Sequence, residues 1–275
     1  MPELPEVQTV VNDLKSTGII GGVIDCVEVY WDNLVGASDG LNFKTGLNNL
    51  LVTDISRRAK YINIALNNHT NLLIHLRMTG KLRWADVNSS RDKHEHIVFN
   101  FTDGRQLRYH DTRKFGRLFL VDNTKEFLAH LGPEPLEKSF TWQVLKANLK
   151  GQRPLKTQLL DQTVVAGLGN IYVDEALWEA KLSPLRKVDT LSVSDLKRLQ
   201  KAIVKVLKSG LKNMGTTLGT SAANFYSVAG RRGNNSDGLK VFRRTGLACN
   251  RCKSILINRI VVGQRSTHFC EGCQK

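Results

Sequence analysis

The stretch Lys60-Tyr61-Ile62-Asn63-Ile64-Ala65-Leu66 is a short run rich in residues that favour extended strands. Similar runs lie on both sides of it, at residues 22–31, 50–55, 71–76, 96–101 and 106–109. Turns that contain Asn, Asp or Gly separate these runs at close spacing. Many short strands with such turns are typical of an antiparallel sandwich or barrel. The sequence therefore predicts an antiparallel β-sandwich in the first half of the chain.

The strand pattern ends near Gly132-Pro133-Glu134-Pro135, where we place a domain boundary. Ahead of the strands, residues 3–16 have apolar side chains at helical spacing. Beyond the boundary, residues 170–182 and 194–213 show the same helical spacing. The predicted fold class is thus α+β with several domains: an N-terminal antiparallel β-sandwich flanked by a helix, and a C-terminal helical domain.

Four of the five cysteines lie in the last 27 residues, with the spacing Cys249-x2-Cys252-x17-Cys270-x2-Cys273. Two CxxC pairs at this separation can place four thiolates around one tetrahedral Zn²⁺. Two disulfides are the alternative, which an intracellular location disfavours. Four protein ligands close a zinc site, so we expect one structural ion that folds this segment into a finger.

The positive charge of the chain is concentrated in its second half. The 275 residues include 40 Lys and Arg against 25 Asp and Glu, a net charge of +15. Residues 1–128 carry 16 basic and 15 acidic residues, and residues 129–275 carry 24 and 10, so the two parts contribute +1 and +14. This imbalance predicts a polyanionic partner, nucleic acid first and an anionic membrane surface second. A transmembrane protein is excluded, because no apolar run approaches the ~18 residues of a membrane span.

The N-terminus combines a proline with two acidic residues. If Met1 is removed, Pro2 becomes the first residue and carries a free secondary amine. An α-amino group has a pKa of about 7.7–8.0, so a useful fraction is neutral and nucleophilic near pH 7. Glu3 and Glu6 share a helix face and can serve as acid and charge stabiliser beside the amine. The same residues also fit an ordinary helix start, where Pro and acidic side chains are common.

Met1-Pro2-Glu3-Leu4-Pro5-Glu6-Val7 is the first of a series of motifs that runs through the chain. The others are Arg57-Arg58-Ala59-Lys60-Tyr61, His75-Leu76-Arg77-Met78-Thr79-Gly80, Asp111-Thr112-Arg113-Lys114-Phe115-Gly116, Leu131-Gly132-Pro133-Glu134-Pro135, Gly167-Leu168-Gly169-Asn170-Ile171-Tyr172 and Gly263-Gln264-Arg265-Ser266-Thr267-His268-Phe269-Cys270. In this order, ending in the four-cysteine finger, they resemble the bacterial formamidopyrimidine-DNA glycosylases (Fpg, or MutM). The resemblance implies a base excision repair enzyme, both DNA glycosylase and AP lyase. Such an enzyme excises 8-oxoguanine opposite cytosine and formamidopyrimidines, then nicks the abasic strand by β,δ-elimination.

The resemblance also implies catalytic roles for five residues. Pro2 corresponds to the nucleophile, which attacks C1′ of the damaged nucleotide, expels the base and forms a Schiff base with the sugar. Glu3 corresponds to the acid that protonates the ring oxygen of the sugar, and Glu6 to the second carboxylate of the site. Lys60 corresponds to the lysine of β-elimination and lesion phosphate binding. Arg265 corresponds to an arginine that binds phosphate and is linked to δ-elimination.

Further residues correspond to DNA contacts of the family. A target base cannot be reached inside a duplex, so it must be flipped out. Met78, Arg113 and Phe115 match the wedge that fills the vacated stack: Met and Phe supply apolar bulk, and Arg can hydrogen-bond the orphaned cytosine. On composition alone, Met78 and Phe115 would be core residues. The other DNA-binding positions implied by the resemblance are His94, Arg153, Lys156 and Asn170.

The motifs and the resemblance together predict four segments. Residues 1–130 form the catalytic β-sandwich, 131–150 a linker, 151–238 a helical domain with the helix–two-turn–helix, and 239–275 the four-cysteine zinc finger. Residues 229–238 form a polar, glycine-rich loop without aromatic side chains, which we expect to be flexible. Because the family uses this loop to help cap the flipped base, the range of lesions is left open.

The expected partner is double-stranded DNA that contains a damaged base or an abasic site, with no membrane partner. The N-terminus is acidic and lacks the layout of a signal peptide, so we expect a cytoplasmic bacterial protein that joins the nucleoid when it binds DNA. On the resemblance alone, we expect a monomer. Two alternatives remain open: a Nei-like enzyme that prefers oxidised pyrimidines, and a non-catalytic, zinc-dependent binder of damaged or single-stranded DNA. The non-catalytic alternative gives Pro2 and its neighbouring carboxylates no common function.

Overall fold

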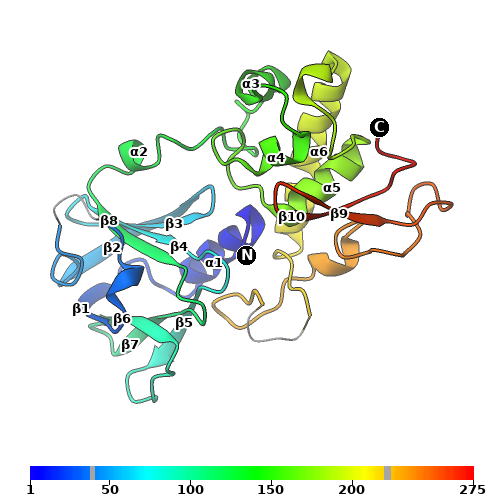
Figure 1. Ribbon diagram of the computed structural model, residues 1–275. Helices are drawn as coiled ribbons and strands as arrows, with labels where there is room; N and C mark the ends of the chain where they lie inside the picture. The colour runs from blue at the N-terminus through cyan, green and yellow to red at the C-terminus, as the bar shows by residue number, and fades with distance from the viewer. Residues whose placement is uncertain (38–40, 220–223) are drawn as a thin grey trace. The chain divides into compact units, whose positions relative to one another are not determined.

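The structure is a computed structural model, and it describes residues 1–37, 41–219 and 224–275. Backbone contacts divide the chain into two compact units. Unit 1 comprises Met1–Ala129 and Met214–Asn234, and unit 2 comprises His130–Asn213 and Asn235–Lys275. The predicted helical segment, residues 151–238, is divided between the two units, because Met214–Asn234 belongs to unit 1. The eight strands β1–β8 belong to unit 1, and the helices α3–α6 belong to unit 2 (Figure 1).

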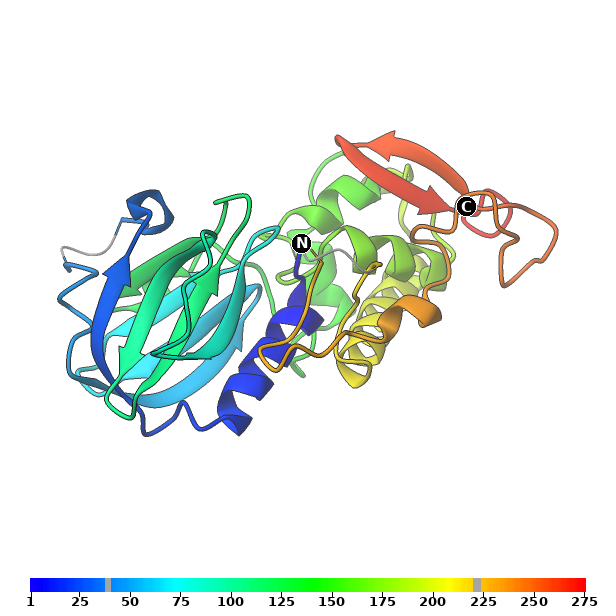
Figure 2. The same cartoon turned by 90° about the horizontal axis from the view of Figure 1, so that it is seen from below.

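In the described residues, unit 1 is built on an eight-stranded antiparallel sheet in the order β5-β7-β6-β1-β2-β3-β4-β8. The strands are β1 (Val23–Val29), β2 (Leu50–Arg58), β3 (Tyr61–Leu66), β4 (Asn71–His75), β5 (Lys81–Asp86), β6 (Glu95–Phe101), β7 (Arg105–His110) and β8 (Arg117–Val121). The pairing of β1 with β2 is short, at Val23–Leu51 and Ile24–Leu50. The sheet therefore folds into two layers around this junction, which is the predicted sandwich (Figure 2).

Helix α1 (Leu4–Ser16) packs along the sandwich against β2 and β3. Its apolar stripe joins the core between the layers, through Val7, Val10, Val11 and Leu14. Full burial of each such side chain contributes roughly 1.5–3 kcal/mol. The helix predicted at residues 3–16 is confirmed, and this packing fixes the N-terminus of the chain to the sandwich. Short turns η1 (Asp32–Leu34) and α2 (Thr124–Phe127) complete the regular elements of this unit.

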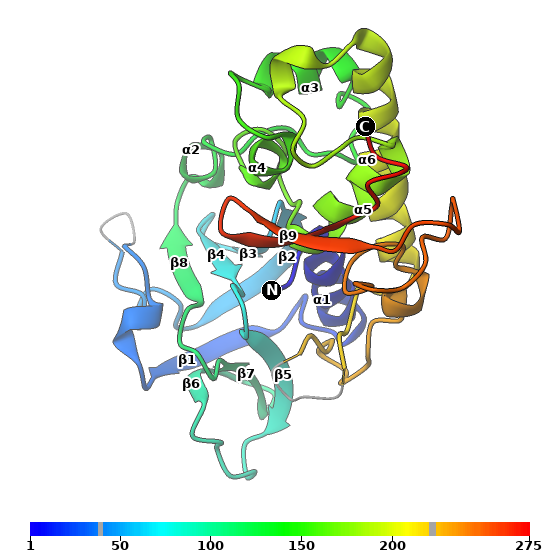
Figure 3. The same ribbon diagram turned by 45° about the vertical axis from the view of Figure 1, so that its right-hand side comes forward.

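Unit 2 consists of helices and a small hairpin. Its helices are α3 (Trp142–Asn148), α4 (Leu155–Leu160), α5 (Asn170–Ala180) and α6 (Val193–Lys212), with 3-10 turns η2 (Val188–Thr190) and η3 (Asn235–Gly238). The hairpin pairs β9 (Asn258–Val262) with β10 (Arg265–Phe269). Helix α5 lies at the centre, packed against α4, α6 and β10 (Figure 3). The predicted α+β fold class is confirmed. Within the described ranges, every helix is too short or too polar to span a membrane.

Candidate functional site

The first turn of α1 carries two buried carboxylates. Glu3 is the N-cap of the helix and Glu6 lies three residues later, and both are at most 2% exposed. The two residues form a capping box, in which the backbone N–H of Glu3 donates to Oε2 of Glu6 at 2.8 Å. Buried carboxylates need such donors, and the positive end of the helix dipole favours their charge. Pro2, also buried, immediately precedes the pair.

A distant part of unit 1 supplies the other hydrogen bond to Glu6. Oε1 of Glu6 accepts from the backbone N–H of Thr216 at 2.6 Å. Gly215 has a φ of 81°, and a Cβ there would lie 2.8 Å from Glu6 Oε1, so only glycine fits. Sequence reasoning missed Gly215 and Thr216. Their signal was a glycine two residues after a predicted helix, which is also an ordinary helix end.

Lys60 lies in the turn between β2 and β3 and is 5% exposed. The preceding Ala59 has a left-handed φ of 52°. The guanidinium of Arg57 holds this turn: Nη1 donates to the carbonyl of Ala59 at 2.9 Å, and Nε donates to Oε1 of Gln8 on α1 at 3.0 Å. One side chain therefore ties the Lys60 turn to the helix that carries Glu3 and Glu6.

His75 ends β4 and faces Tyr61 across the strand pair, edge to face at 4.8 Å between ring centroids. Burial first, and then the charges of Arg77 and Lys60, lower the pKa of His75 from 6.5 to about 3. Its Nδ1 accepts the backbone N–H of Arg77 at 3.1 Å. The ring is therefore neutral at pH 7, and an acceptor at the edge of the site.

Met78, Arg113 and Phe115 lie on two loops of unit 1 and contact one another. Nη1 of Arg113 lies 3.1 Å from Sδ of Met78, and the Arg113 guanidinium lies 4.6 Å from the centroid of the Phe115 ring. Met78 is 38% exposed and Phe115 is 48% exposed. Their placement in the core, which composition alone favours, is excluded. The structure brings the three predicted wedge residues together as one surface cluster.

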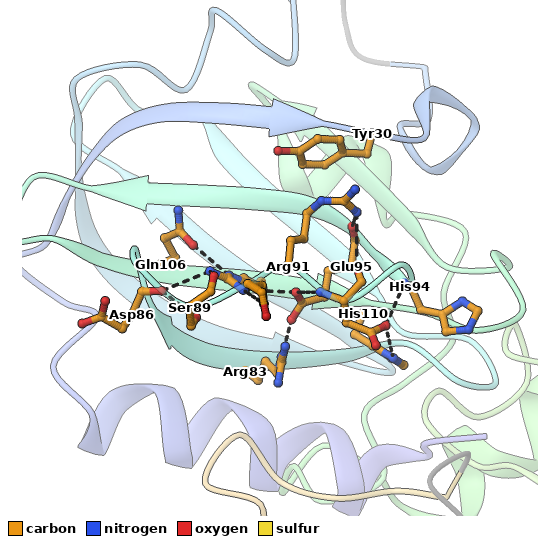
Figure 4. Close-up of polar contacts among 12 residues, drawn as sticks. Tyr30, Arg83, Asp86, Ser89, Arg91, His94, Glu95, Gln106 and His110 are labelled. Carbon is orange, nitrogen blue, oxygen red and sulfur yellow. Dashed lines mark hydrogen bonds and ion pairs between the residues drawn. The ribbon is translucent and has the colours of Figure 1, made fainter.

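His94 lies at the end of the loop between β5 and β6 (Figure 4), and a buried ion pair anchors this loop. Glu95 and Arg108 are at most 2% exposed and pair at 3.2 Å between Oε2 and Nη1. Arg108 also donates to the carbonyls of Asp86 and Ser89 at 3.0 and 2.8 Å. The Arg108 guanidinium bonds the backbone at the start of the loop and pairs with Glu95 at its end. These contacts fix the backbone next to His94.

In unit 2, a hydrogen bond holds Asn170 to the backbone beside Arg265. Asn170 is the first residue of α5, and its Nδ2 donates at 2.9 Å to the carbonyl of Ser266, the residue after Arg265. Arg265 is exposed, as is Arg153 in the turn before α4. A helix N-terminus beside a guanidinium favours phosphate. The two predicted phosphate-binding positions, Asn170 and Arg265, therefore lie close together in unit 2.

Lys156, a further predicted DNA contact, is enclosed within unit 2. Its side chain is fully buried, and Nζ donates to Asp174 Oδ1 at 2.6 Å and to the carbonyl of Ser266 at 2.8 Å. Asp174 also accepts from the backbone N–H of His268 at 2.9 Å. The prediction of a phosphate contact for Lys156 is wrong, because its ammonium group is enclosed and already has oxygen partners. Lys156 instead joins α4, α5 and β10.

The stretch 229–238 is the segment predicted to form a flexible loop. The backbone N–H of Ala229 donates to Asp13 Oδ2 on α1 at 3.2 Å, and Arg231 forms an ion pair with the same carboxylate. Residues Asn235–Gly238 form the turn η3. Contacts with a buried aspartate and a 3-10 turn therefore hold the two ends of the stretch, and its flexibility stays a prediction.

Four sulfur atoms form a cluster at the end of unit 2. The Sγ atoms of Cys249, Cys252, Cys270 and Cys273 all lie within 4.8 Å of one another. Two of the separations are 3.8 Å (Cys249–Cys273) and 3.7 Å (Cys252–Cys270). Tetrahedral Zn²⁺ with Zn–S bonds of about 2.3 Å requires about 3.8 Å between sulfurs. The cluster fits one zinc ion, and the four cysteines are free of disulfides.

The electrostatics of the cysteines differ within the cluster. A backbone hydrogen bond from Ile255 lowers the pKa of Cys252 to about 6, so this thiol ionises near neutral pH. Burial raises the pKa of Cys270 to about 12. Zinc deprotonates a coordinating thiol outright, so ion binding overcomes the free-energy cost of ionising the buried Cys270. Nε1 of Trp178 lies 3.4 Å from Sγ of Cys249 and donates to it from α5.

Comparison with known proteins identifies the family. The model of the formamidopyrimidine-DNA glycosylase N-terminal domain matches residues 1–118, and the model of the helix–two-turn–helix (H2TH) domain of the same enzymes matches residues 131–222. A model of the zinc finger found in Fpg and isoleucyl-tRNA synthetase matches residues 246–275. The chain is 44% identical over 276 residues to a formamidopyrimidine-DNA glycosylase of Protochlamydia amoebophila, with both proteins covered completely. The chain belongs to the formamidopyrimidine-DNA glycosylase (Fpg) family.

Other Fpg proteins show the same relation. The chain is 40% identical to the Fpg of Herpetosiphon aurantiacus, again over the whole of both proteins. Among solved structures, a Lactococcus lactis Fpg variant in complex with DNA containing Fapy-dG superposes with a TM-score of 0.90, at 37% identity and 100% coverage of both chains. Wild-type L. lactis Fpg bound to DNA with an oxidised pyrimidine superposes with a TM-score of 0.89 at 36% identity, again with 100% coverage of both chains. With the family's finger and the fitted sulfur cluster, the chain holds one structural zinc ion.

The anchor of the His94 loop gives a stability prediction. Arg108→Ala leaves Glu95 buried without its enclosed partner, which lowers the free energy of unfolding by about 3–5 kcal/mol. Arg83 pairs with the same carboxylate, but its side chain is 48% exposed. Arg83→Ala is therefore expected to cost at most about 1 kcal/mol. Urea denaturation of both variants measures the difference, and equal losses would contradict the assigned role of burial.

His75 gives a pH prediction. The pKa of His75 is about 3 in the folded state and 6.5 when unfolded, so the unfolded chain binds one more proton between these values. The free energy of unfolding is therefore not reduced by His75 above pH 6.5. Below this pH it falls, by about 2 kcal/mol between pH 7.5 and 5.0. In urea denaturation at both pH values, His75→Asn should lose this part of the pH dependence. The control His69→Asn, at an exposed turn, should retain it, and identical slopes for all three proteins would refute the assignment.

Proposed function

We propose that the amine of Pro2 carries the reaction of this Fpg-family enzyme. The chain is a DNA glycosylase with AP lyase activity that acts in base excision repair of oxidised purines, on DNA with a damaged base or an abasic site. The observation that carries the proposal is the buried pair Glu3 and Glu6 in a capping box directly after Pro2. An ordinary helix start does not need two enclosed carboxylates, since exposed acids complement the dipole equally well.

The chemistry follows from these groups. The neutral Pro2 amine attacks C1′ of the damaged nucleotide, and an N–C1′ bond forms as the bond from C1′ to the base breaks. The base leaves with the electron pair of that bond and takes up the proton that the amine nitrogen loses. Glu3 gives a proton to the ring oxygen as the C1′–O4′ bond opens, which leaves an iminium ion on the sugar. Glu6 keeps its charge beside this cation, because its oxygens are held by the backbone N–H groups of Glu3 and Thr216. The iminium acidifies C2′, so loss of that proton breaks the C3′–O3′ bond.

Two cations complete the strand cleavage. Lys60, held beside α1 through Arg57, assists β-elimination and binds the phosphates of the lesion. Arg265, exposed next to the Asn170–Ser266 contact, binds phosphate and assists δ-elimination at C5′. Both roles need a cation within reach of a phosphate oxygen, which is a charge-assisted contact.

Entry of the lesion into the site requires base flipping, which costs a few kcal/mol of stacking and pairing. Met78 and Phe115 offer exposed apolar surface to replace the lost stacking, and Arg113 between them offers donors to the orphaned cytosine. His94, Arg153, Asn170 and Arg265 position the backbone through phosphate contacts. The 24 basic residues in residues 129–275 supply the sequence-independent affinity.

The domain roles and cellular setting are part of the proposal. Unit 1, with residues 1–129 and 214–234, carries the amine and the wedge; in unit 2, residues 130–213 hold the helix–two-turn–helix and residues 239–275 form the zinc finger. The protein works as a monomer. It resides in the cytoplasm and joins the nucleoid when it is bound to DNA.

Borohydride trapping tests the proposed nucleophile and the lesion class. We expect a covalent adduct on a duplex with 8-oxoguanine opposite cytosine, mapped by mass spectrometry to Pro2, and none on undamaged DNA. A Gly-Ser extension ahead of Pro2 removes the secondary amine and should abolish the adduct. Pro2→Gly keeps a terminal amine and should retain it at a lower rate. An adduct in the extended protein would contradict the mechanism, and an adduct restricted to an oxidised pyrimidine would assign the protein to the Nei-like branch.

Zinc removal separates binding from chemistry. A chelator should weaken affinity for the lesion duplex at least about tenfold, because the finger that carries Arg265 unfolds without its ion. Trapping on a single-stranded oligonucleotide with a preformed abasic site should persist, since Pro2 and the carboxylates lie in unit 1. Cys249→Ser should reproduce the effect of chelation, whereas Cys26→Ser, outside the cluster, should not. Unchanged duplex affinity in the zinc-free protein would show that the finger is dispensable.

A further inference from the structure

The two loops that carry the wedge cluster are held by one buried side chain, Asp111. Its exposure is 0%. Oδ1 of Asp111 accepts from the hydroxyl of Thr79, on the Met78 loop, and from the backbone N–H of Arg113 at 3.2 Å. Oδ2 accepts from the backbone N–H of Gly116 at 2.8 Å. One carboxylate therefore joins residues 76–80 to residues 111–116.

The backbone of Asp111 is fixed as firmly as its side chain. Its N–H donates to the carbonyl of His94 at 2.9 Å, which continues the pairing of β6 with β7. Its carbonyl lies 3.0 Å from Nε2 of the buried His96 and accepts the backbone N–H of Lys114 at 3.4 Å. The carboxylate is thus anchored to the sandwich, not to a mobile loop.

Gly80 and Gly116, one on each loop, pack closely against the hydroxyl of Tyr109. A Cβ at Gly80 would lie 2.2 Å from the hydroxyl oxygen of Tyr109, and a Cβ at Gly116 would lie 1.6 Å from it. Burial first, and then the charge of Asp111, raise the pKa of Tyr109 well above 10, so the phenol remains neutral. Because both loops contact this one hydroxyl, it sets the distance between the two loops.

We propose that Asp111 is a positioning residue that sets the geometry of Met78, Arg113 and Phe115 before DNA binds. The wedge then enters the duplex as one body, without an additional loss of conformational freedom on insertion. The charge matters, because three donors converge on the two oxygens and charge-assisted hydrogen bonds are stronger than neutral ones. An amide in the same place would turn an N–H group toward one of these donors. This inference rests on the wedge role given under the proposed function.

Two substitutions with matched controls test the inference. Asp111→Asn should lower single-turnover excision of 8-oxoguanine from a duplex by about 10- to 100-fold, because a misplaced wedge loses part of the gain from preorganisation. Thr79→Val removes one of the three donors and should lower it by about 3- to 10-fold. Thr79→Ser restores the hydroxyl, and Asp122→Asn changes an exposed carboxylate, so both should stay within about twofold of the wild-type rate.

The substrate distinguishes positioning from general damage to the fold. A single-stranded oligonucleotide with a preformed abasic site needs no base extrusion, so all variants should form the borohydride-trapped adduct within about twofold of the wild-type rate. The preference for cytosine over adenine opposite 8-oxoguanine should also fall in Asp111→Asn, since Arg113 is displaced.

Equal losses on both substrates, or no loss on the duplex, would overturn the inference. If circular dichroism shows that Asp111→Asn does not fold, the comparison of Thr79→Val with Thr79→Ser tests the inference instead. Failure of the wild-type protein to form any adduct would instead refute the proposed function.

Discussion

Burial of negative charge at the start of α1 is the constraint on which the N-terminal region depends. Enclosed carboxylates are tolerated only where donors and a favourable field compensate for lost hydration. The first turn of α1 supplies the field and one backbone donor to Glu6, and the segment that returns after α6 supplies the other through Thr216. That return explains why Met214–Asn234 belongs to unit 1 although it follows the last long helix of unit 2. The N-terminus is thus shaped by residues from the far end of the chain.

The sequence predicted most clearly those features in which a few residues fix a geometry by their own chemistry. The cysteine spacing implied a four-sulfur cluster, and the structure has one of the right dimensions. Apolar stripes predicted α1, α5 and α6. The strands β5 and β8 were missed. They lie at the two ends of the sheet order, where each pairs with one neighbour, and β5 interleaves charged residues such as Lys81 and Arg83 with its apolar ones.

Buried charge marks the limit of prediction from sequence. Lys156, Glu95, Arg108 and Asp111 have the side chains of surface residues, and nothing local to them indicates an interior position. Each has at least one partner from another element of the chain, such as Asp174 for Lys156 and Thr79 for Asp111. Met78, Arg113 and Phe115 lie together at the surface, although composition favoured core positions for Met78 and Phe115. A family motif identifies residues of interest. It does not distinguish a residue that contacts DNA from a residue that positions such a contact.

The contact of Lys156 with Asp174 and Ser266 bears on how far the finger can be treated as a module. The hairpin β9–β10 depends on α4 and α5 for the partners of its own polar groups. A peptide cut to residues 239–275 would expose those groups and lose the support beneath Arg265, even with zinc bound. Grafting this finger onto another scaffold would therefore mean transplanting Lys156, Asp174 and Asn170 with it, and the smallest exchangeable piece is a finger together with two helices.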